Sequence, residues 1–145
     1  MLRKGMQFNT LQDDILYKVL VGSELAQKLT GCIRKGIKPT DVAPVTREDC
    51  TISSLALSAG SVQLGTSHVN IIIPDIADCT APGAQTFSAD TARIKLLAEL
   101  AYKCLEKHYC ENGWAFSWVQ QDVIAEPNLH AHRLWIKIRF NFHNI

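Results

Sequence analysis

The chain has 145 residues, of which 47% are hydrophobic and 20% are charged, and its formal net charge is +1 at pH 7. These values are typical of a single globular domain and argue against a coiled coil, a disordered chain or a membrane protein. The five cysteines are odd in number and widely scattered, which favours a reducing compartment over a disulfide framework. We expect neither a signal peptide nor a transmembrane helix, because no apolar run is long enough.

Charge is unevenly distributed along the chain. Residues 1–47 hold eight Lys and Arg against four Asp and Glu, whereas residues 48–145 hold seven against ten. Such asymmetry suits a subunit that contacts its own copies through unlike surfaces. The nearly neutral total argues against nucleic acid as the main partner.

The first third of the chain predicts two helices. An apolar face follows Thr10, which can cap a helix whose first turn holds Asp13 and Asp14. Ser23 is a second N-cap, for a shorter helical turn that stops at Gly31.

A basic segment follows these helices. A short strand begins at Cys32, and Pro39 and Pro44 interrupt the sequence after it. We expect a basic loop or arm near residues 34–48, serving either as a solvated connection or as a contact surface. Its cations are the candidate protein-interaction residues Arg34, Lys35, Lys38 and Arg47.

The middle of the chain predicts a hairpin and a long loop. Residues 50–57 and 67–73 are rich in Ile, Val, Ser and Thr, which favour strands. Pro74 ends the second strand because it has no N–H to donate. Residues 75–89 contain Pro, Gly and small polar residues, and they are expected to form a long loop.

The second half predicts one helix and two long strands. The helix begins after Ser88 or Asp90 and ends before Asn112, and the strands cover residues 114–126 and 129–144. The last strand alternates clearly, which indicates one buried and one wet face. Its apolar face consists of Leu134, Ile136, Ile138, Phe140 and Phe142.

The predicted order is therefore α-α-β-β-β-α-β-β, in a single α+β domain over residues 1–145. The expected architecture is a mostly antiparallel sheet of about five strands with the helices packed on one face. We expect Leu97, Ala101 and Leu105 of the second-half helix to pack against the apolar face of the last strand. Trp114, Phe116 and Trp118 share one face of a strand, either as core residues or as a subunit interface.

Few residues suggest chemistry. On a strand, His130 and His132 would point to the same face, as a two-ligand metal clamp requires, but no third ligand is evident. Cys104 and His108 share a helical face, where such cysteines usually act as small core residues. The sequence has no nucleophile elbow and no phosphate-binding glycine pattern. We therefore predict no cofactor, no metal and no enzymatic activity.

Three short motifs carry a family resemblance. They are the strand Gly31-Cys-Ile-Arg-Lys, the arm ending in Arg47-Glu48-Asp49, and the strand Val69-Asn-Ile-Ile-Ile-Pro-Asp. Together with the order of elements, they make the chain resemble small phage tail-completion proteins, also called tail terminators or head-tail joining proteins.

The resemblance implies a structural role. Members of that family form a ring, commonly a hexamer, that caps the tail tube and docks to the head connector without catalysing a reaction. The implied location is the cytoplasm during assembly and then the virion. The projecting loops of that family correspond here to the basic arm and residues 75–89. Acidic groups that could face the arm of a neighbouring copy are Glu48, Asp49, Asp75 and Asp78.

Two alternatives remain open at this point. One is a small cytoplasmic metal-binding or enzymatic domain that uses His130 and His132. The other is a nucleic-acid binder that uses the basic arm, which would show salt-dependent affinity.

Overall fold

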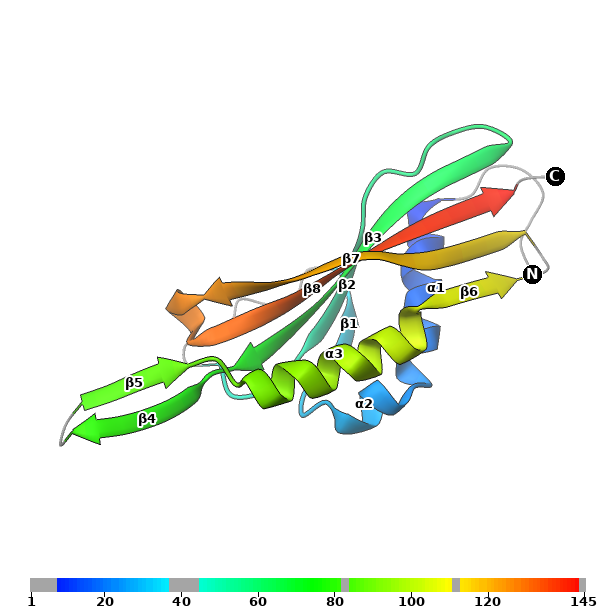
Figure 1. Ribbon diagram of the computed structural model, residues 1–145. Coiled ribbons are helices and arrows are strands. Elements are labelled where there is room, and N and C mark those ends of the chain that lie inside the picture. Colours follow the sequence, from blue (N-terminus) through cyan, green and yellow to red (C-terminus); the bar gives the residue numbers. More distant parts are fainter. Residues whose placement is uncertain (1–7, 37–44, 82–83, 111–112, 144–145) are drawn as a thin grey trace.

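The computed structural model describes residues 8–36, 45–81, 84–110 and 113–143. Within these ranges the helices are α1 (Asn9–Val21), α2 (Glu24–Lys28) and α3 (Thr91–Leu105), with a short 3-10 turn, η1 (Pro127–Leu129). The strands are β1 (Ile33–Lys35), β2 (Cys50–Ser54), β3 (Val62–Pro74), β4 (Ile76–Ala81), β5 (Ala84–Ser88), β6 (Lys107–Cys110), β7 (Trp114–Glu126) and β8 (Ala131–His143). The protein has an α+β fold, as predicted (Figure 1).

The main sheet has six strands in the described part of the chain, in the order β1-β2-β3-β8-β7-β6. β1 runs parallel to β2, and every other neighbouring pair is antiparallel. β3 and β8 lie at the centre and pair along their whole length, from Val62 opposite His143 to Pro74 opposite Ala131. A mostly antiparallel sheet is therefore confirmed, but it has six strands rather than about five.

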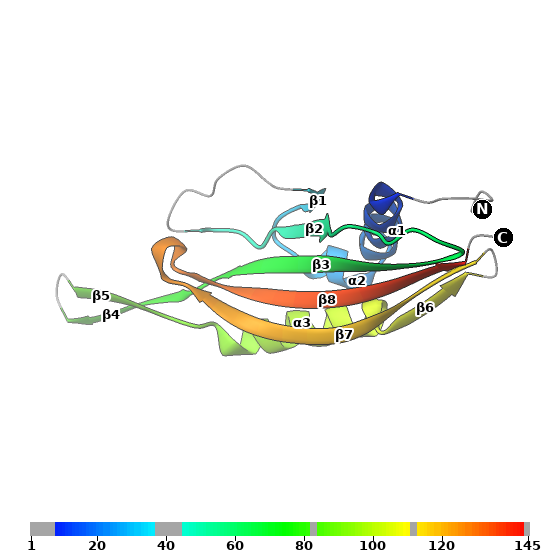
Figure 2. The same cartoon turned by 90° about the horizontal axis from the view of Figure 1, so that it is seen from above.

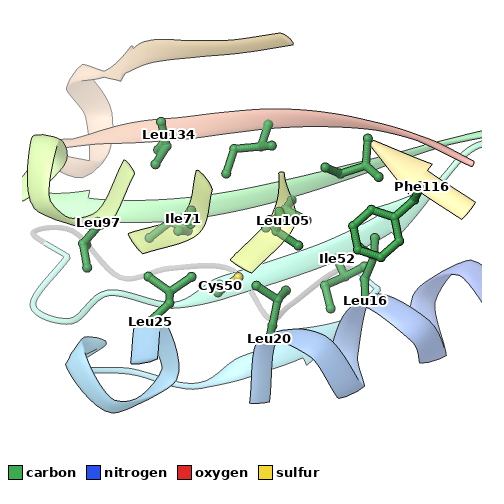
Figure 3. Close-up of a cluster of buried hydrophobic side chains, with 14 of the residues drawn as sticks. Leu16, Leu20, Leu25, Cys50, Ile52, Ile71, Leu97, Leu105, Phe116 and Leu134 are labelled. Atoms are coloured by element: carbon green, nitrogen blue, oxygen red, sulfur yellow. The ribbon is translucent and has the colours of Figure 1, made fainter. Parts of the chain in front are cut away.

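All three helices pack on one face of this sheet, as expected. Figure 3 shows side chains of α1, α2 and α3 pointing towards those of the strands, including Leu20, Leu25 and Leu105. The predicted register of the last strand is confirmed, because its whole apolar face is buried. The buried members of that face are Leu134, Ile136, Ile138, Phe140 and Phe142, and α3 contributes Leu97, Ala101 and Leu105 to the same cluster.

The aromatic stripe of β7 belongs to the core. Phe116 is buried, and Trp114 and Trp118 pack against the same cluster. Phe116 lies beside Phe140 of β8, with 5.2 Å between the ring centroids. The core interpretation of this stripe is thus confirmed.

Several predicted boundaries were wrong. α1 begins at Asn9, one residue before the expected cap, and its first turn holds no acidic residue. α3 ends at Leu105, and the chain enters β6 at Lys107, because pairing with β7 competes with another helical turn. Asp90 is the N-cap of α3, as predicted, and its carboxylate accepts a hydrogen bond from the backbone N–H of Arg93 at 3.1 Å.

Residues 75–89 form a hairpin instead of the expected long loop. β4 and β5 pair with each other in a separate two-stranded sheet, with Ile76 opposite Ser88 and Ala77 opposite Phe87. Figures 1 and 2 show this hairpin projecting beyond one end of the main sheet. The prediction of one long loop failed because the described strands β4 and β5 take up most of this segment.

None of the described helices is both long and apolar enough to cross a membrane.

Candidate functional site

The base of the β4–β5 hairpin holds a pocket of about 350 Å³. Its polar side chains come from three places: Asp75 between β3 and β4, His130 after η1, and His132 on β8. Its other lining residues are Phe87, Ala125, Pro127 and Ala131. The pocket therefore lies where the hairpin leaves the main sheet.

Two contacts fix the hairpin at this place. Nδ1 of His132 lies 2.6 Å from Oδ1 of Asp75, whose side chain is only 8% exposed. The ring of Phe87, on β5, stacks on that of His130 with 3.8 Å between centroids. A backbone hydrogen bond of 2.9 Å from Asp75 N–H to the carbonyl of His130 adds a third link. Phe87 of β5 and Asp75, the residue before β4, are thus tied to His130 and to the beginning of β8.

The two histidines do not project from one face of a strand, as their spacing suggested. β8 begins at Ala131, so His130 lies outside the strand, with a left-handed backbone (φ 52°) at the end of η1. Both imidazoles still line one pocket, but His132 contacts Asp75 and His130 stacks on Phe87. Among the described residues, no group of three or more His, Cys, Asp and Glu side chains is placed to hold a metal ion. The geometry supports a structural joint between the hairpin and the sheet.

Cys104 and His108 do not share a helical face either. His108 lies on β6, beyond the end of α3, and its Nε2 is 2.7 Å from the carbonyl oxygen of Cys104. Burial raises the pKa of the Cys104 thiol and raises that of Cys50 to about 12. These two thiols are therefore protonated at neutral pH and act as core residues.

The structure separates the residues of the predicted basic arm. Arg34 and Lys35 belong to β1, so the arm does not begin at residue 34. The Lys35 ammonium lies 2.8 Å from the Asp14 carboxylate and 5.2 Å from the centre of the Tyr17 ring. The contact with Asp14 raises the pKa of Lys35.

The other basic residues have different surroundings. Arg34 is paired with Thr51 of β2, and both lie on the face of the sheet opposite the helices. Among the described residues, the buried Nε atom of Arg34 has no hydrogen-bond partner. Arg47 lies 3.3 Å from Asp49 and keeps an exposed side chain. Lys38 lies outside the described residues.

Glu48 and Asp49 are internal, which corrects the expectation that they face a neighbouring copy. Glu48 is 4% exposed, and its carboxylate accepts two hydrogen bonds from Arg93 of α3, at 2.6 and 2.8 Å. Asp49 is 5% exposed and accepts from the backbone N–H of Cys32 at 2.8 Å. A Cβ atom at Gly31 would overlap the Asp49 carboxylate, so only glycine allows this close approach. These acids stabilise the fold.

The contact between Asp75 and His132 could not be predicted from the sequence. Asp75 and His132 are 57 residues apart, and they meet because Pro74 is paired with Ala131 in the central strand pair. The sequence indicates two strands with compatible patterns, but it does not indicate their register.

No known family model matches the chain, and no curated protein matches it either.

Proposed function

We propose that this protein is a structural subunit of a phage tail or head-tail junction. It assembles into a ring that caps the tail tube and joins it to the head connector, and it catalyses no reaction. It is made and assembled in the cytoplasm and then becomes part of the virion. The ring is a hexamer, following the family that the sequence resembles.

The main support for this proposal is the projecting β4–β5 hairpin. A two-stranded hairpin outside the core buries little apolar surface by itself, and an isolated hairpin is only marginally stable. Here Ile76 is 46% exposed and Asp78 is exposed on its first strand. A neighbouring copy that covers this strand would bury its apolar side chain and pair its charge.

A ring also needs two unlike surfaces that meet with a constant rotation. The hairpin offers one surface, with Asp78 as its exposed acid. The exposed cations Lys35 and Arg47 lie on a separate part of the molecule, near β1 and β2. Lys38 remains a candidate for the same contact, and so does Arg34, which lies on the opposite face of β1 from Lys35. Complementary charges of this kind mainly govern register and association rate.

A matched pair of double variants tests the hairpin contact. Ile76→Lys with Asp78→Lys changes one exposed apolar and one exposed acidic residue on β4. Leu96→Lys with Glu99→Lys makes the same change on α3, where Leu96 is 39% exposed and Glu99 is exposed. Circular dichroism first checks that both variants fold.

Ring formation is then followed by electron microscopy of the concentrated protein, and tail capping by co-sedimentation with tail tubes that lack a terminator. We expect rings and tube binding for the wild type and the α3 variant, and neither for the β4 variant. Wild-type protein that neither forms rings nor binds tubes would overturn the proposal. If the two double variants form rings and bind tubes to the same extent, the hairpin is not the contact surface.

A further inference from the structure

The main sheet has an open face, which we define as the face opposite the helices. Figure 2 looks onto this face, with the helices behind it. In the described part of the chain, Val45 covers one end of it by packing against Ile72. Outward residues of β8 alternate here with the buried apolar ones, and they include Arg133, Trp135, Lys137 and Arg139.

Two cations lie in the middle of the open face. Lys137 is paired with His68 of β3, and Arg139 is paired with Thr66. Because they are two residues apart on one strand, their Cα atoms are about 7 Å apart. The neighbouring residues of β7 in these two rows are also polar: Gln120 beside Lys137 and Ser117 beside Arg139.

These two cations differ from the other basic residues of β8. Arg133 forms an ion pair of 2.8 Å with Glu126. Within the described residues, neither Lys137 nor Arg139 is within ion-pair distance of a carboxylate. Asp122 of β7 lies on the same face, opposite Trp135, and forms no ion pair with either cation in the described part of the chain.

The field of Lys137 acts on its neighbour His68. Burial is the first cause that lowers the pKa of His68, and the positive charge of Lys137 is the second. An added anion near this pair would remove the second effect. The centre of the open face is thus a place where a negative group is favoured over a further positive one.

We propose that the open face binds the phosphate backbone of double-stranded DNA, without sequence preference, through Lys137 and Arg139. Their spacing along β8 suits successive phosphates of one strand. Thr66, Ser117 and Gln120 flank them and can donate further hydrogen bonds to phosphate oxygens, as hydroxyl and amide side chains commonly do. This inference depends on a face of the single subunit and not on ring formation.

The aromatic residue of the face favours a duplex over a single strand. Single-strand binding usually combines cations with aromatic rings on which bases stack. Trp135 is only partly exposed, and it makes an edge contact with His68, at 5.2 Å between centroids. With its ring engaged in this way, the face presents donors for phosphates rather than a platform for bases.

Fluorescence anisotropy with a labelled 20-base-pair duplex tests the proposal, over a series of salt concentrations. The test variant is Lys137→Gln with Arg139→Gln. The control is Lys18→Gln with Lys95→Gln, which removes the same charge from exposed positions on the helical side. A single strand of the same sequence and poly-glutamate are the comparison ligands.

We expect the test variant to bind the duplex at least tenfold more weakly than the wild type. The slope of log affinity against log salt should fall by about 2, because two phosphate contacts are lost. The control should keep the wild-type slope. Each of three results would overturn the proposal. The first is no duplex binding at low salt, and the second is an equal loss of duplex affinity in the test and control variants. The third is binding of the single strand or of poly-glutamate that is as tight as, or tighter than, binding of the duplex. Ring formation, measured separately, does not enter this result.

Discussion

Arg93 joins three segments that are far apart in the sequence. Its guanidinium binds the buried Glu48 carboxylate through two nitrogens. It also donates a hydrogen bond to the carbonyl oxygen of Lys28, the last residue of α2. The contact with Glu48 raises the pKa of Arg93. Glu48 is further held by the backbone N–H of Thr30, at 3.2 Å from one carboxylate oxygen. Loss of the arginine would leave a buried carboxylate without its counter-charge.

Arg93→Met should therefore lower the free energy of unfolding by about 3 kcal/mol, as for other buried ion pairs that lose one partner. Arg133→Met is the control, because Arg133 pairs with Glu126 on the surface and should lose less than about 1 kcal/mol. Urea denaturation of both variants measures the difference. Equal losses would show that the Arg93 contact has no special role.

Ile138 tests the register of the central strand. Its side chain is fully buried, in the cluster that contains Leu105 of α3. Ile138→Ala should cost about 2 to 5 kcal/mol through lost burial and a residual cavity. Ile124→Ala, at a position 41% exposed on β7, should cost much less. A loss below about 0.5 kcal/mol for Ile138→Ala in denaturant melts would place this residue at the surface and contradict the register.

His68 makes stability depend on pH. Its pKa is lower in the folded state than in the unfolded chain, so the unfolded chain binds the proton more readily. The contribution of His68 to the free energy of unfolding is therefore lost as pH falls through about 6.5, the ordinary pKa of histidine. It stays low at pH values below the folded-state pKa of His68. NMR titration should show a lowered pKa that rises towards the ordinary value in Lys137→Gln. An unchanged pKa in that variant would exclude Lys137 as a cause.

At the scale of elements, the last two strands were predictable and the β4–β5 hairpin was not. The bounds of β7 match the predicted 114–126, and the alternation in β8 identified its buried face. These signals are local, because a strand with one buried face repeats every two residues. β6 and the β4–β5 pair are short, so they depend on partners that the sequence does not identify.

The candidate site was predictable only in part, for the same reason. The pattern singled out His130 and His132, and both line the pocket. Their actual partners are Phe87 and Asp75, at the two ends of a segment predicted to be a loop. The acids next to Arg47 also have distant partners, since Glu48 binds Arg93 at a separation of 45 residues.

The joint at the base of the hairpin should limit its motion. His132→Ala removes the contact with Asp75 while leaving the main core unchanged. We expect faster amide hydrogen exchange over residues 76–88 and unchanged exchange in β3 and β8, because few other contacts hold the hairpin. Glu126→Gln, which weakens only the nearby pair with Arg133, is the control. Unchanged exchange in His132→Ala would mean that the Asp75 contact does not hold the hairpin.

At the scale of the whole molecule, the fold distributes charge differently from the sequence. The sequence places the excess of basic residues in the first 47 positions. In the structure, Lys35 of that segment is paired with Asp14, and Arg47 lies beside Asp49. The cations without an acidic partner among the described residues include Lys137 and Arg139, near the end of the chain. A near-neutral total charge therefore coexists with a locally basic face.

The mass of the protein in solution tests the structural role most directly. Light scattering at high concentration and low salt should give a mass several times that of the 16.1 kDa chain, and six times that mass for a hexamer. The mass should fall as salt is raised, because the contacts between unlike charged surfaces are screened. The mass of a single chain at every concentration and salt would contradict self-assembly into a ring.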